Sequence, residues 1–285
     1  MLTLGLNAKP RLSNETFRLL RDIIYARCGI FFADNKKYLL ETRLARRLED
    51  KNLKSFEDYY YFLTYDPEKE KELSNVQNSI VTNETSFFRD PAQLNAFIKG
   101  VVPKVIEEKA GSADRKVRVW SAASSTGEEP YTLAIMMLEE KLNLKGYSIE
   151  VFGSDISDVV LRSAESATYD KYTLRNMPPE LIARYFRPTG TAYALERRVR
   201  ELVTYKKVNL VSSMDTRMMK GMDIIFCRNV LIYFDDTSKK KAVAHLYDGL
   251  APGGYLFVGF SETLHNITRL FRPVSIERSV VYQKA

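Results

Sequence analysis

Apolar residues in the first ninety positions recur at the spacing of amphipathic helices. In the clearest case, Leu40, Leu44 and Leu48 lie four residues apart and share one helical face. Helix starts are expected near Ser13, Lys36, Ser55 and Glu68, two of them at serine residues that are good N-caps. We therefore predict an all-α N-terminal domain over residues 1–90.

The pattern changes near residue 115, where short β-rich runs begin to alternate with helical segments. Such alternation is typical of βαβ units and a parallel sheet. Strands are expected at 116–122, 149–155, 222–229, 253–261 and 279–285, with a helix from Pro130 to Leu142. Residues 91–285 therefore predict a doubly wound, Rossmann-like α/β domain. Charged residues at about 188–208 do not fit the alternation and predict a small antiparallel β-insertion.

The composition is that of a globular protein of 285 residues, 45% hydrophobic and 28% charged. No stretch approaches the ~18 uninterrupted apolar residues of a membrane span, and the opening residues lack a signal-peptide pattern. The two cysteines and two histidines lie apart, which predicts neither a disulfide framework nor a metal site. We expect a cytoplasmic chain without metal or direct membrane insertion. The net charge of +7 suits nucleic acid, a membrane surface or an acidic protein, and alone favours none.

Ligands of a doubly wound sheet bind beyond the carboxyl ends of its strands. The first expected strand is followed by SAASSTGEEP, whose small side chains let a ligand approach the backbone and the next helix N-terminus. The run is not a GxGxxG pattern, and Glu128 and Glu129 would repel a pyrophosphate but attract an ammonium group. Complementing the helix dipole is the alternative role of these carboxylates. We favour that role for Glu128 and ligand contact for Glu129.

Two further strand ends carry polar residues. Asp155 closes the second strand, where an acidic side chain can accept hydrogen bonds from ribose hydroxyls or cap the next helix. The spacing does not choose between these two roles. Arg228 and Asn229 close the third strand and precede Tyr233 in CRNVLIYF. This arrangement suits a site for a planar adenine or a reacting group, and a core turn with one buried asparagine is the alternative.

Several segments together resemble the CheR family of chemotaxis receptor methyltransferases. They are TNETSFFRD (82–90), RVWSAASSTGEEPYTLA (118–134), VFGSDIS (151–157), VNL (208–210), FCRNVLIYF (226–234) and GFSETL (259–264). The likeness extends in order over nearly the whole chain. It implies an enzyme that transfers a methyl group from S-adenosylmethionine to receptor glutamates, forming methyl esters and S-adenosylhomocysteine in sensory adaptation.

The resemblance also implies the residues of the site. It places cofactor contacts at Asn83, Thr85, Arg89, Glu129, Asp155, Asn209, Leu210, Arg228 and Asn229. Within this set, Asp155 would bind the ribose hydroxyls, and Asn209 and Leu210 would lie near the adenine. Arg89 and Tyr233 would stand beside the transferring methyl group and the incoming carboxylate, as the catalytic pair.

The expected partner is the helical, glutamate-rich methylation region of a receptor. Lys36, Arg43 and Arg47 share one face of a predicted helix, and Arg46 broadens it. A solvated face is the alternative for such a stripe, and we favour a docking surface. The β-insertion would match the family's β-subdomain, which tethers some members to a receptor peptide. The turn PTGTAYALE lacks the glycine-rich form of those members, so we expect recognition without that peptide, by a monomer.

Methyl transfer to a carboxylate needs no general base, because a glutamate with a pKa of roughly 4.3 is ionised at neutral pH. A methyltransferase of RNA, DNA or a small molecule is the first alternative. The CRNVLIYF segment, however, lacks the Asn/Asp-Pro-Pro-Tyr element of base amino-methyltransferases, and no nucleic-acid partner is expected. The second alternative is a non-catalytic module, which is expected to have lost Asp155, Arg89 or the STGEEP loop. All three are present.

Overall fold

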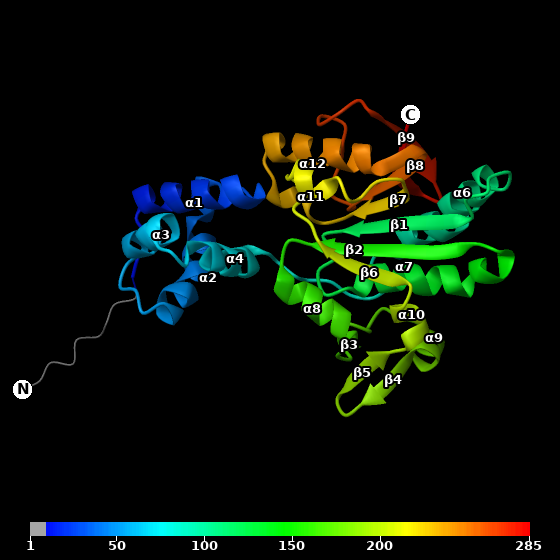
Figure 1. Cartoon of the computed structure of the whole chain (residues 1–285), viewed down its shortest axis with the longest axis horizontal. Coiled ribbons are helices and arrows are strands. Elements are labelled where there is room, and N and C mark those ends of the chain that lie inside the picture. The colour runs from blue at the N-terminus through cyan, green and yellow to red at the C-terminus, as the bar shows by residue number, and fades with distance from the viewer. Residues whose placement is uncertain (1–9) are drawn as a thin grey trace, which may run out of the picture. The chain divides into compact units, whose positions relative to one another are not determined.

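The structure of the chain, a computed structural model, describes residues 10–285. The chain divides into two compact units, an all-helical one that ends at Thr82 and a larger one that begins at Asn83 (Figure 1). Within the described residues, none of the helices has the length and apolar character needed to cross a membrane.

The division lies at residue 82, whereas the sequence suggested residue 90. The reason is that the intervening segment bonds within the larger unit. The Phe87 amide donates to the Thr173 carbonyl at 3.0 Å, and the Phe88 amide donates to the Thr132 hydroxyl at 3.2 Å. The segment that was expected to close the helical domain is therefore part of the α/β unit.

The helical unit confirms the four helices expected from the sequence. They are α1 (Asn14–Cys28), α2 (Lys37–Asp50), α3 (Phe56–Tyr65) and α4 (Lys69–Ile80), with a 3-10 turn (Asp34–Lys36) ahead of α2. The Ser13 hydroxyl accepts the Thr16 amide at 3.1 Å and caps α1. Gly29 ends α1 with a φ of 74°, a left-handed conformation that favours glycine.

Glu72 is a buried carboxylate inside this unit. It accepts hydrogen bonds from Arg47 at 2.7 and 2.9 Å, from the Tyr59 hydroxyl at 2.7 Å and from the Asn75 amide at 3.0 Å. Burial acts to raise the pKa of Glu72, but the bonds from Arg47, Asn75 and Tyr59 outweigh it, so the pKa is lowered. The network therefore stabilises the unit at neutral pH, and its contribution is lost as the pH falls through the lowered pKa.

The larger unit is built on a seven-stranded sheet in the order β6-β2-β1-β7-β8-β10-β9. Its strands are β1 (Lys116–Ala122), β2 (Ser148–Asp155), β6 (Val203–Lys207), β7 (Met222–Cys227), β8 (Leu250–Val258), β9 (Phe271–Ile276) and β10 (Ser279–Lys284). The first five run parallel, and β10 runs antiparallel to both neighbours. A three-stranded antiparallel sheet contains β3 (Thr168–Tyr169), β4 (Phe186–Thr189) and β5 (Ala192–Leu195). The expected fold class is confirmed.

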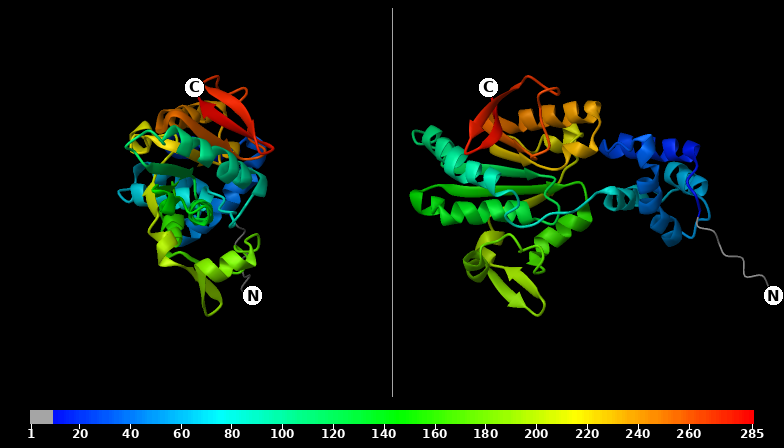
Figure 2. Two further views of the ribbon diagram at one scale, coloured as in Figure 1. Left: turned by 90° about the vertical axis from the view of Figure 1, so that its right-hand side faces the viewer. Right: turned by 180° about the vertical axis from the view of Figure 1, so that it is seen from behind.

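The helices of the larger unit lie on both sides of the main sheet. They are α5 (Pro91–Asn95), a π-helical segment (Ala96–Val101), α6 (Val102–Glu108), α7 (Glu128–Glu139), α8 (Asp158–Ser166), α9 (Pro179–Tyr185), α10 (Arg197–Arg200), α11 (Ser213–Thr216) and α12 (Asp236–Gly249), with 3-10 turns at Leu142–Lys145 and Leu231–Tyr233. Of these, α9 lies beside β4 of the small sheet. The crossover from β1 to β2 runs toward the β6 edge of the sheet, and the crossover from β7 to β8 runs toward the β9 edge. Right-handed crossovers therefore place α7 and α12 on opposite faces. Figures 1 and 2 show α12 along the β7–β8 half and α7 and α8 along the β1–β2–β6 half.

The centre of the sheet is the core of this unit. All residues of β7 are buried, as expected for a parallel strand that is covered on both faces. The Phe226 ring stacks on Phe257 of β8, with 4.4 Å between centroids. Trp120 of β1 is fully buried, and its indole donates to the Ser154 hydroxyl at 2.8 Å.

The segment at about 188–208, which was expected to form one antiparallel insertion, is divided between two sheets. Ala192–Leu195 lies in the small sheet, and Arg197–Arg200 is helical. Val203–Lys207 pairs parallel with β2 at the edge of the main sheet, so the prediction for these residues is wrong. The charged residues of this segment do not distinguish an insertion from an edge strand, because lysines are also usual on the exposed edge of a sheet.

Replacing Arg47 by methionine should destabilise the helical unit by about 3 kcal/mol, because buried Glu72 would lose the guanidinium that binds both its oxygens and keep only Lys51, 3.9 Å away, as a cation within the described residues. Arg46→Met is the matched control, since Arg46 is exposed on the same helix and should change the stability by less than about 0.5 kcal/mol. Hydrogen exchange of α2 and α4 amides measures both variants. Equal protection in the two would contradict a stabilising role of the buried pair.

Candidate functional site

The chain leaves the middle of the main sheet in opposite directions at β1 and β7. The carboxyl ends of these two strands meet, with Ala122 opposite Cys227, and β2 ends beside β1. Ligands of open α/β sheets bind at such a switch point. The candidate site is therefore formed by the connections that follow β1, β2, β6, β7 and β8, which we call the carboxyl edge.

The connection after β1 has an unusual backbone. Ala123 and Ser125 have φ values of 59° and 50°, and Gly127 has 95°. Of ten non-glycine residues with positive φ in the described chain, five lie in connections of the carboxyl edge or in the segment before α5: Phe88, Asp90, Ala123, Ser125 and Asn229. Positive φ is costly for residues with a Cβ and is often found at functional sites.

Gly127 is required at the end of this connection. A Cβ there would collide with the Tyr205 hydroxyl and lie 2.8 Å from the Cβ of Ala164. The Ser124 amide donates to the Ser154 carbonyl at 2.7 Å, which ties the connection to β2. The Ser124 hydroxyl is buried and has no hydrogen-bond partner within the described chain. Such an orphaned group is consistent with a ligand that would complete its hydrogen bonding.

Asp155 ends β2 and is 7% exposed. Its carboxylate accepts the Ser125 amide and the Ser157 amide, each at 3.0 Å, one on each oxygen. Burial raises the pKa of this carboxyl above its ordinary value, and the backbone hydrogen bonds act against that rise. Each oxygen retains a further lone pair, so Asp155 can still accept from hydroxyl groups of a ligand.

Arg228 is a buried cation that joins three parts of the site. Its guanidinium donates to Glu129 at 3.0 Å and to the Arg89 carbonyl at 3.2 Å, and it lies 3.6 Å from Asp90. The other oxygen of Glu129 accepts the Ser121 hydroxyl at 2.7 Å. Glu129 and Arg228, which the sequence assigned to ligand contact, are thus bound to each other in the structure.

Glu128 differs from its neighbour Glu129. Its side chain is buried and accepts hydrogen bonds from the Thr126 hydroxyl at 2.8 and 2.9 Å. Burial raises the pKa of Glu128, and the bond from Thr126 opposes that rise. Glu128 is the first residue of α7, which agrees with the helix-terminus role favoured for it.

The segment before α5 brings three further expected residues to this edge. The Arg89 guanidinium donates to the Glu84 carbonyl at 2.9 Å and forms no ion pair with any residue from 10 to 285. The Asn83 carbonyl accepts the Ser125 hydroxyl at 3.5 Å. Thr85, which lies between Asn83 and Arg89 in the sequence, is half-buried. An arginine that is positioned but lacks an acidic partner is available to bind a carboxylate.

Glu262 holds the connections after β7 and β8 together. Its carboxylate accepts three backbone amides, from Asn229 at 2.9 Å, from Ile232 at 3.2 Å and from Gly259 at 2.6 Å. Gly259 is needed at this point because a Cβ would lie 2.6 Å from Glu262 and 2.9 Å from the Asn229 amide. Half-buried Tyr233 follows in the 3-10 turn Leu231–Tyr233.

Asn209 and Leu210 follow β6, at the same end of the sheet as Asp155. The Asn209 amide donates to Asp215 at 3.0 Å, and the Asn209 side chain accepts the Val211 amide at 3.2 Å. Leu210 is buried, and its carbonyl lies 2.8 Å from a ring nitrogen of His245. These bonds fix the connection that would border a planar ligand.

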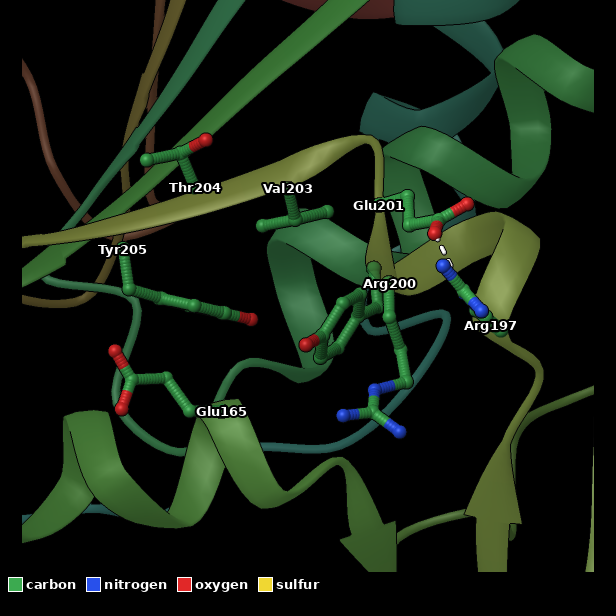
Figure 3. A pocket seen from close by; sticks show the side chains of 8 residues that line it. Glu165, Arg197, Arg200, Glu201, Val203, Thr204 and Tyr205 are labelled. Carbon is green, nitrogen blue, oxygen red and sulfur yellow. Dashed lines mark hydrogen bonds and ion pairs between the residues drawn. The ribbon is translucent and has the colours of Figure 1, made fainter.

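A hollow of about 550 Å³ lies beside β6 and is lined by residues of β6, α8 and α10 (Figure 3). Arg197 and Glu201 pair at 2.6 Å on its rim, and Arg200 and Tyr205 also line it. Tyr205 is the side chain that closes the space next to Gly127. Tyr205 therefore packs against the connection after β1.

All ten cofactor or catalytic residues expected from the sequence lie in the segment before α5 or at the carboxyl edge, where Asp155 ends β2 and Glu129 lies in the first turn of α7. The basic residues expected to dock a partner lie in the helical unit. Arg43 donates to the Ile80 carbonyl and to the Thr82 hydroxyl, and Arg47 binds Glu72. Both guanidinium groups are thus engaged within their own unit, while Lys36 and Arg46 are exposed.

Three contributors to the site were missed by reasoning from the sequence. Ser121 and Ser124 belong to the SAASSTGEEP run, which was interpreted only as a row of small side chains. Glu262 lies in GFSETL, a segment that contributed to the resemblance but received no role. A glutamate gives no sequence signal of a backbone contact when its partner lies about thirty residues away, as the Asn229 amide does from Glu262.

The chemistry of the carboxyl edge is that of a binding site for a ligand with hydroxyl and cationic groups. Asp155 and Glu129 supply carboxylates, and the connection after β1 supplies backbone groups close to a helix N-terminus. Cys227 is fully buried, and burial raises the pKa of its thiol well above the ordinary value. It is therefore an inert thiol and no nucleophile.

Comparison with known proteins divides the chain as the structure does. Residues 83–280 match the family described as CheR methyltransferase, SAM binding domain, and residues 15–80 match CheR methyltransferase, all-alpha domain. Chemotaxis protein methyltransferase 2 of Vibrio cholerae is 34% identical, with 96% of this chain and 94% of that protein covered. Chemotaxis protein methyltransferase 1 of Pseudomonas aeruginosa is 32% identical, with 95% and 98% covered. Chemotaxis protein methyltransferase of Escherichia coli is 36% identical, with 95% and 92% covered.

Replacing Glu262 by alanine should destabilise the larger unit by about 2 kcal/mol, because three amides lose a charged acceptor. Glu140→Ala is the matched control, since Glu140 is exposed at the end of α7. Urea unfolding of both variants gives the difference in the free energy of unfolding. A Glu262 variant as stable as the control would show that water replaces the carboxylate without loss.

Proposed function

Because this chain belongs to the CheR methyltransferase family, we propose that it methylates glutamate side chains of chemotaxis receptors. It is an S-adenosylmethionine-dependent methyltransferase, and the products would be glutamate methyl esters and S-adenosylhomocysteine. The observation that carries this proposal is the match of both family domains, together with near-complete relatives that are named chemotaxis protein methyltransferases. We place the reaction in the cytoplasm and propose that the chain acts as a monomer.

The residues of the carboxyl edge fit S-adenosylmethionine. The orphaned Ser124 hydroxyl and the positive-φ backbone beside it leave polar groups for a ligand. We propose that Asp155 accepts hydrogen bonds from the ribose hydroxyls and that Glu129 attracts the ammonium group of the methionine part. The remaining proposed contacts are Asn83, Thr85, Arg89, Asn209, Leu210, Arg228 and Asn229.

The reaction requires positioning and little acid–base chemistry. S-adenosylmethionine supplies an electrophilic methyl group on a sulfonium sulfur, which leaves as a neutral thioether. The ionised glutamate oxygen forms the new C–O bond as the C–S bond breaks, so no proton has to move. Holding the two groups in line can supply roughly 7–11 kcal/mol of barrier reduction.

We propose that Arg89 orients the incoming carboxylate and that Tyr233 lies beside the methyl group. The support for Arg89 is its position: the segment on either side of it is fixed by the positive φ of Phe88 and Asp90, and its guanidinium has no acidic partner within residues 10–285. The support for Tyr233 is its place in the 3-10 turn of the connection after β7, the connection that also contains Asn229.

The exposed basic residues of the helical unit, Lys36 and Arg46, are proposed to attract the receptor. Their charge complements a glutamate-rich helix, and such surface charges act mainly on association. Arg43 and Arg47 lie on the same helix as Arg46, but their guanidinium groups donate hydrogen bonds to Thr82 and Glu72 within the helical unit. We further propose that the chain recognises the receptor without binding a tethering peptide on the small sheet, because the turn between β4 and β5 is short.

The direct test uses S-adenosylmethionine labelled on its methyl group, the purified chain and membranes that carry chemotaxis receptors. Label should appear on the receptor and should be released as methanol by mild base, because carboxyl esters are base-labile. Label that resists base, or that appears on nucleic acid, would replace the proposed acceptor with another one. Failure to bind S-adenosylhomocysteine would favour a non-catalytic module.

Two variants should separate cofactor binding from turnover. Asp155→Ala should weaken S-adenosylhomocysteine binding by about tenfold or more, because the ribose loses its acceptor. Arg89→Ala should lower kcat more than it weakens S-adenosylhomocysteine binding, since its proposed partner is the acceptor carboxylate. Calorimetry and initial rates measure the two effects. Small and equal losses in both variants would mean that the pocket is assigned to the wrong residues.

Arg46→Met should raise the KM for receptor membranes several-fold at low salt and leave S-adenosylhomocysteine binding unchanged. The difference from wild type should shrink at high salt, because exposed charges are screened. Glu49→Met provides the opposite charge change on the same helix and should not raise the KM. A KM for the Arg46 variant that is independent of salt would contradict electrostatic docking.

A further inference from the structure

Two apolar side chains stand in water at the carboxyl edge. Phe260 is 94% exposed and Ile232 is 50% exposed. They come from different connections, Phe260 from the one after β8 and Ile232 from the 3-10 turn after β7. Exposed apolar residues are ordinary when they are single, but a pair beside a proposed active site indicates an interaction surface.

The backbone that carries this pair is held in place. Glu262 accepts the Ile232 amide at 3.2 Å and the Gly259 amide at 2.6 Å, so one carboxylate fixes both connections. The Glu262 amide in turn donates to the Gly259 carbonyl at 2.8 Å, which closes a turn with Phe260 inside it. A surface that is ordered before binding loses little conformational entropy when a partner arrives.

The same carboxylate links this pair to the proposed chemistry. Its third bond is to the Asn229 amide at 2.9 Å, and Tyr233 follows Ile232 directly. Phe260 and Ile232 therefore lie in the two connections that Glu262 joins to the Asn229 amide, next to the proposed position of the acceptor carboxylate. We call these two residues the apolar rim.

We propose that the apolar rim contacts apolar side chains of the receptor helix one turn away from the target glutamate. On a helix, residues three and four positions from a glutamate lie on its own face. A helix that points its glutamate into the site would therefore lay those neighbours against the rim. Burying a phenylalanine and an isoleucine there favours binding of an acceptor helix over a free carboxylate. This inference rests on the proposed function and adds the part of the substrate that is recognised.

The test compares Phe260→Ser and Ile232→Ser with wild type by titrating receptor membranes in the labelled methyl-transfer assay. Each variant should raise the KM for receptor by about tenfold, and Phe260→Leu should restore most of the loss. Affinity for S-adenosylhomocysteine, measured by calorimetry, should stay the same and would show that the variants are folded. Leu270→Ser is the control, because Leu270 is 48% exposed just before β9, at the end of the sheet away from the site.

The outcomes distinguish this inference from the proposed function. Normal methylation by wild type with an unchanged KM in both rim variants would overturn the apolar rim alone. A loss in the Leu270 variant as large as in the rim variants would also overturn it, since any exposed apolar residue would then suffice. No methylation of receptors by wild type would overturn the proposed function, and the rim inference would fall with it.

Discussion

A charged guanidinium can be buried only when carboxylates and carbonyls replace the water it has lost. Arg228 meets this condition at its two terminal nitrogens with Glu129, the Arg89 carbonyl and Asp90, while its Nε has no hydrogen-bond partner within the described residues. These partners belong to the start of α7 and to the segment before α5, which lie far from Arg228 in sequence. The charge is satisfied only when the end of β7 meets both, so folding the core and assembling the carboxyl edge become one event.

Around this ion pair the backbone is set before any ligand arrives. Positive φ values at Ala123, Ser125 and Asn229 are costly, and the surrounding hydrogen bonds hold them. A reaction that moves no proton has little use for a tuned acid or base and much use for fixed geometry. The concentration of backbone strain at this edge, with no nucleophile–base pair among the residues assigned to the site, is consistent with that demand.

Sequence patterns predicted the fold class, the four N-terminal helices and the main strands, because these depend on local periodicity of apolar residues. The carboxyl-edge positions of Asp155 and Arg228 also followed, since residues at the ends of parallel strands must meet. The edge strand at 203–207 did not follow, because membership of a sheet depends on a partner distant in sequence. The pairing of Arg47 with Glu72 did not follow for a related reason: Glu72 lies on another helix, and burial cannot be deduced from a charge stripe. Glu262 was overlooked because backbone amides carry no sequence signature.

The packing of Tyr205 has a consequence for how this chain can diverge. Its ring lies where a side chain on Gly153 would have to go, and its hydroxyl lies against Gly127. A smaller residue at position 205 would therefore open room for a side chain at 153, while Gly127, with its φ of 95°, would stay restricted to glycine. Substitutions at 153 and 205 are thus expected to be epistatic across related sequences. A smaller residue at 205 should come first, because a side chain at 153 would otherwise collide with the Tyr205 ring.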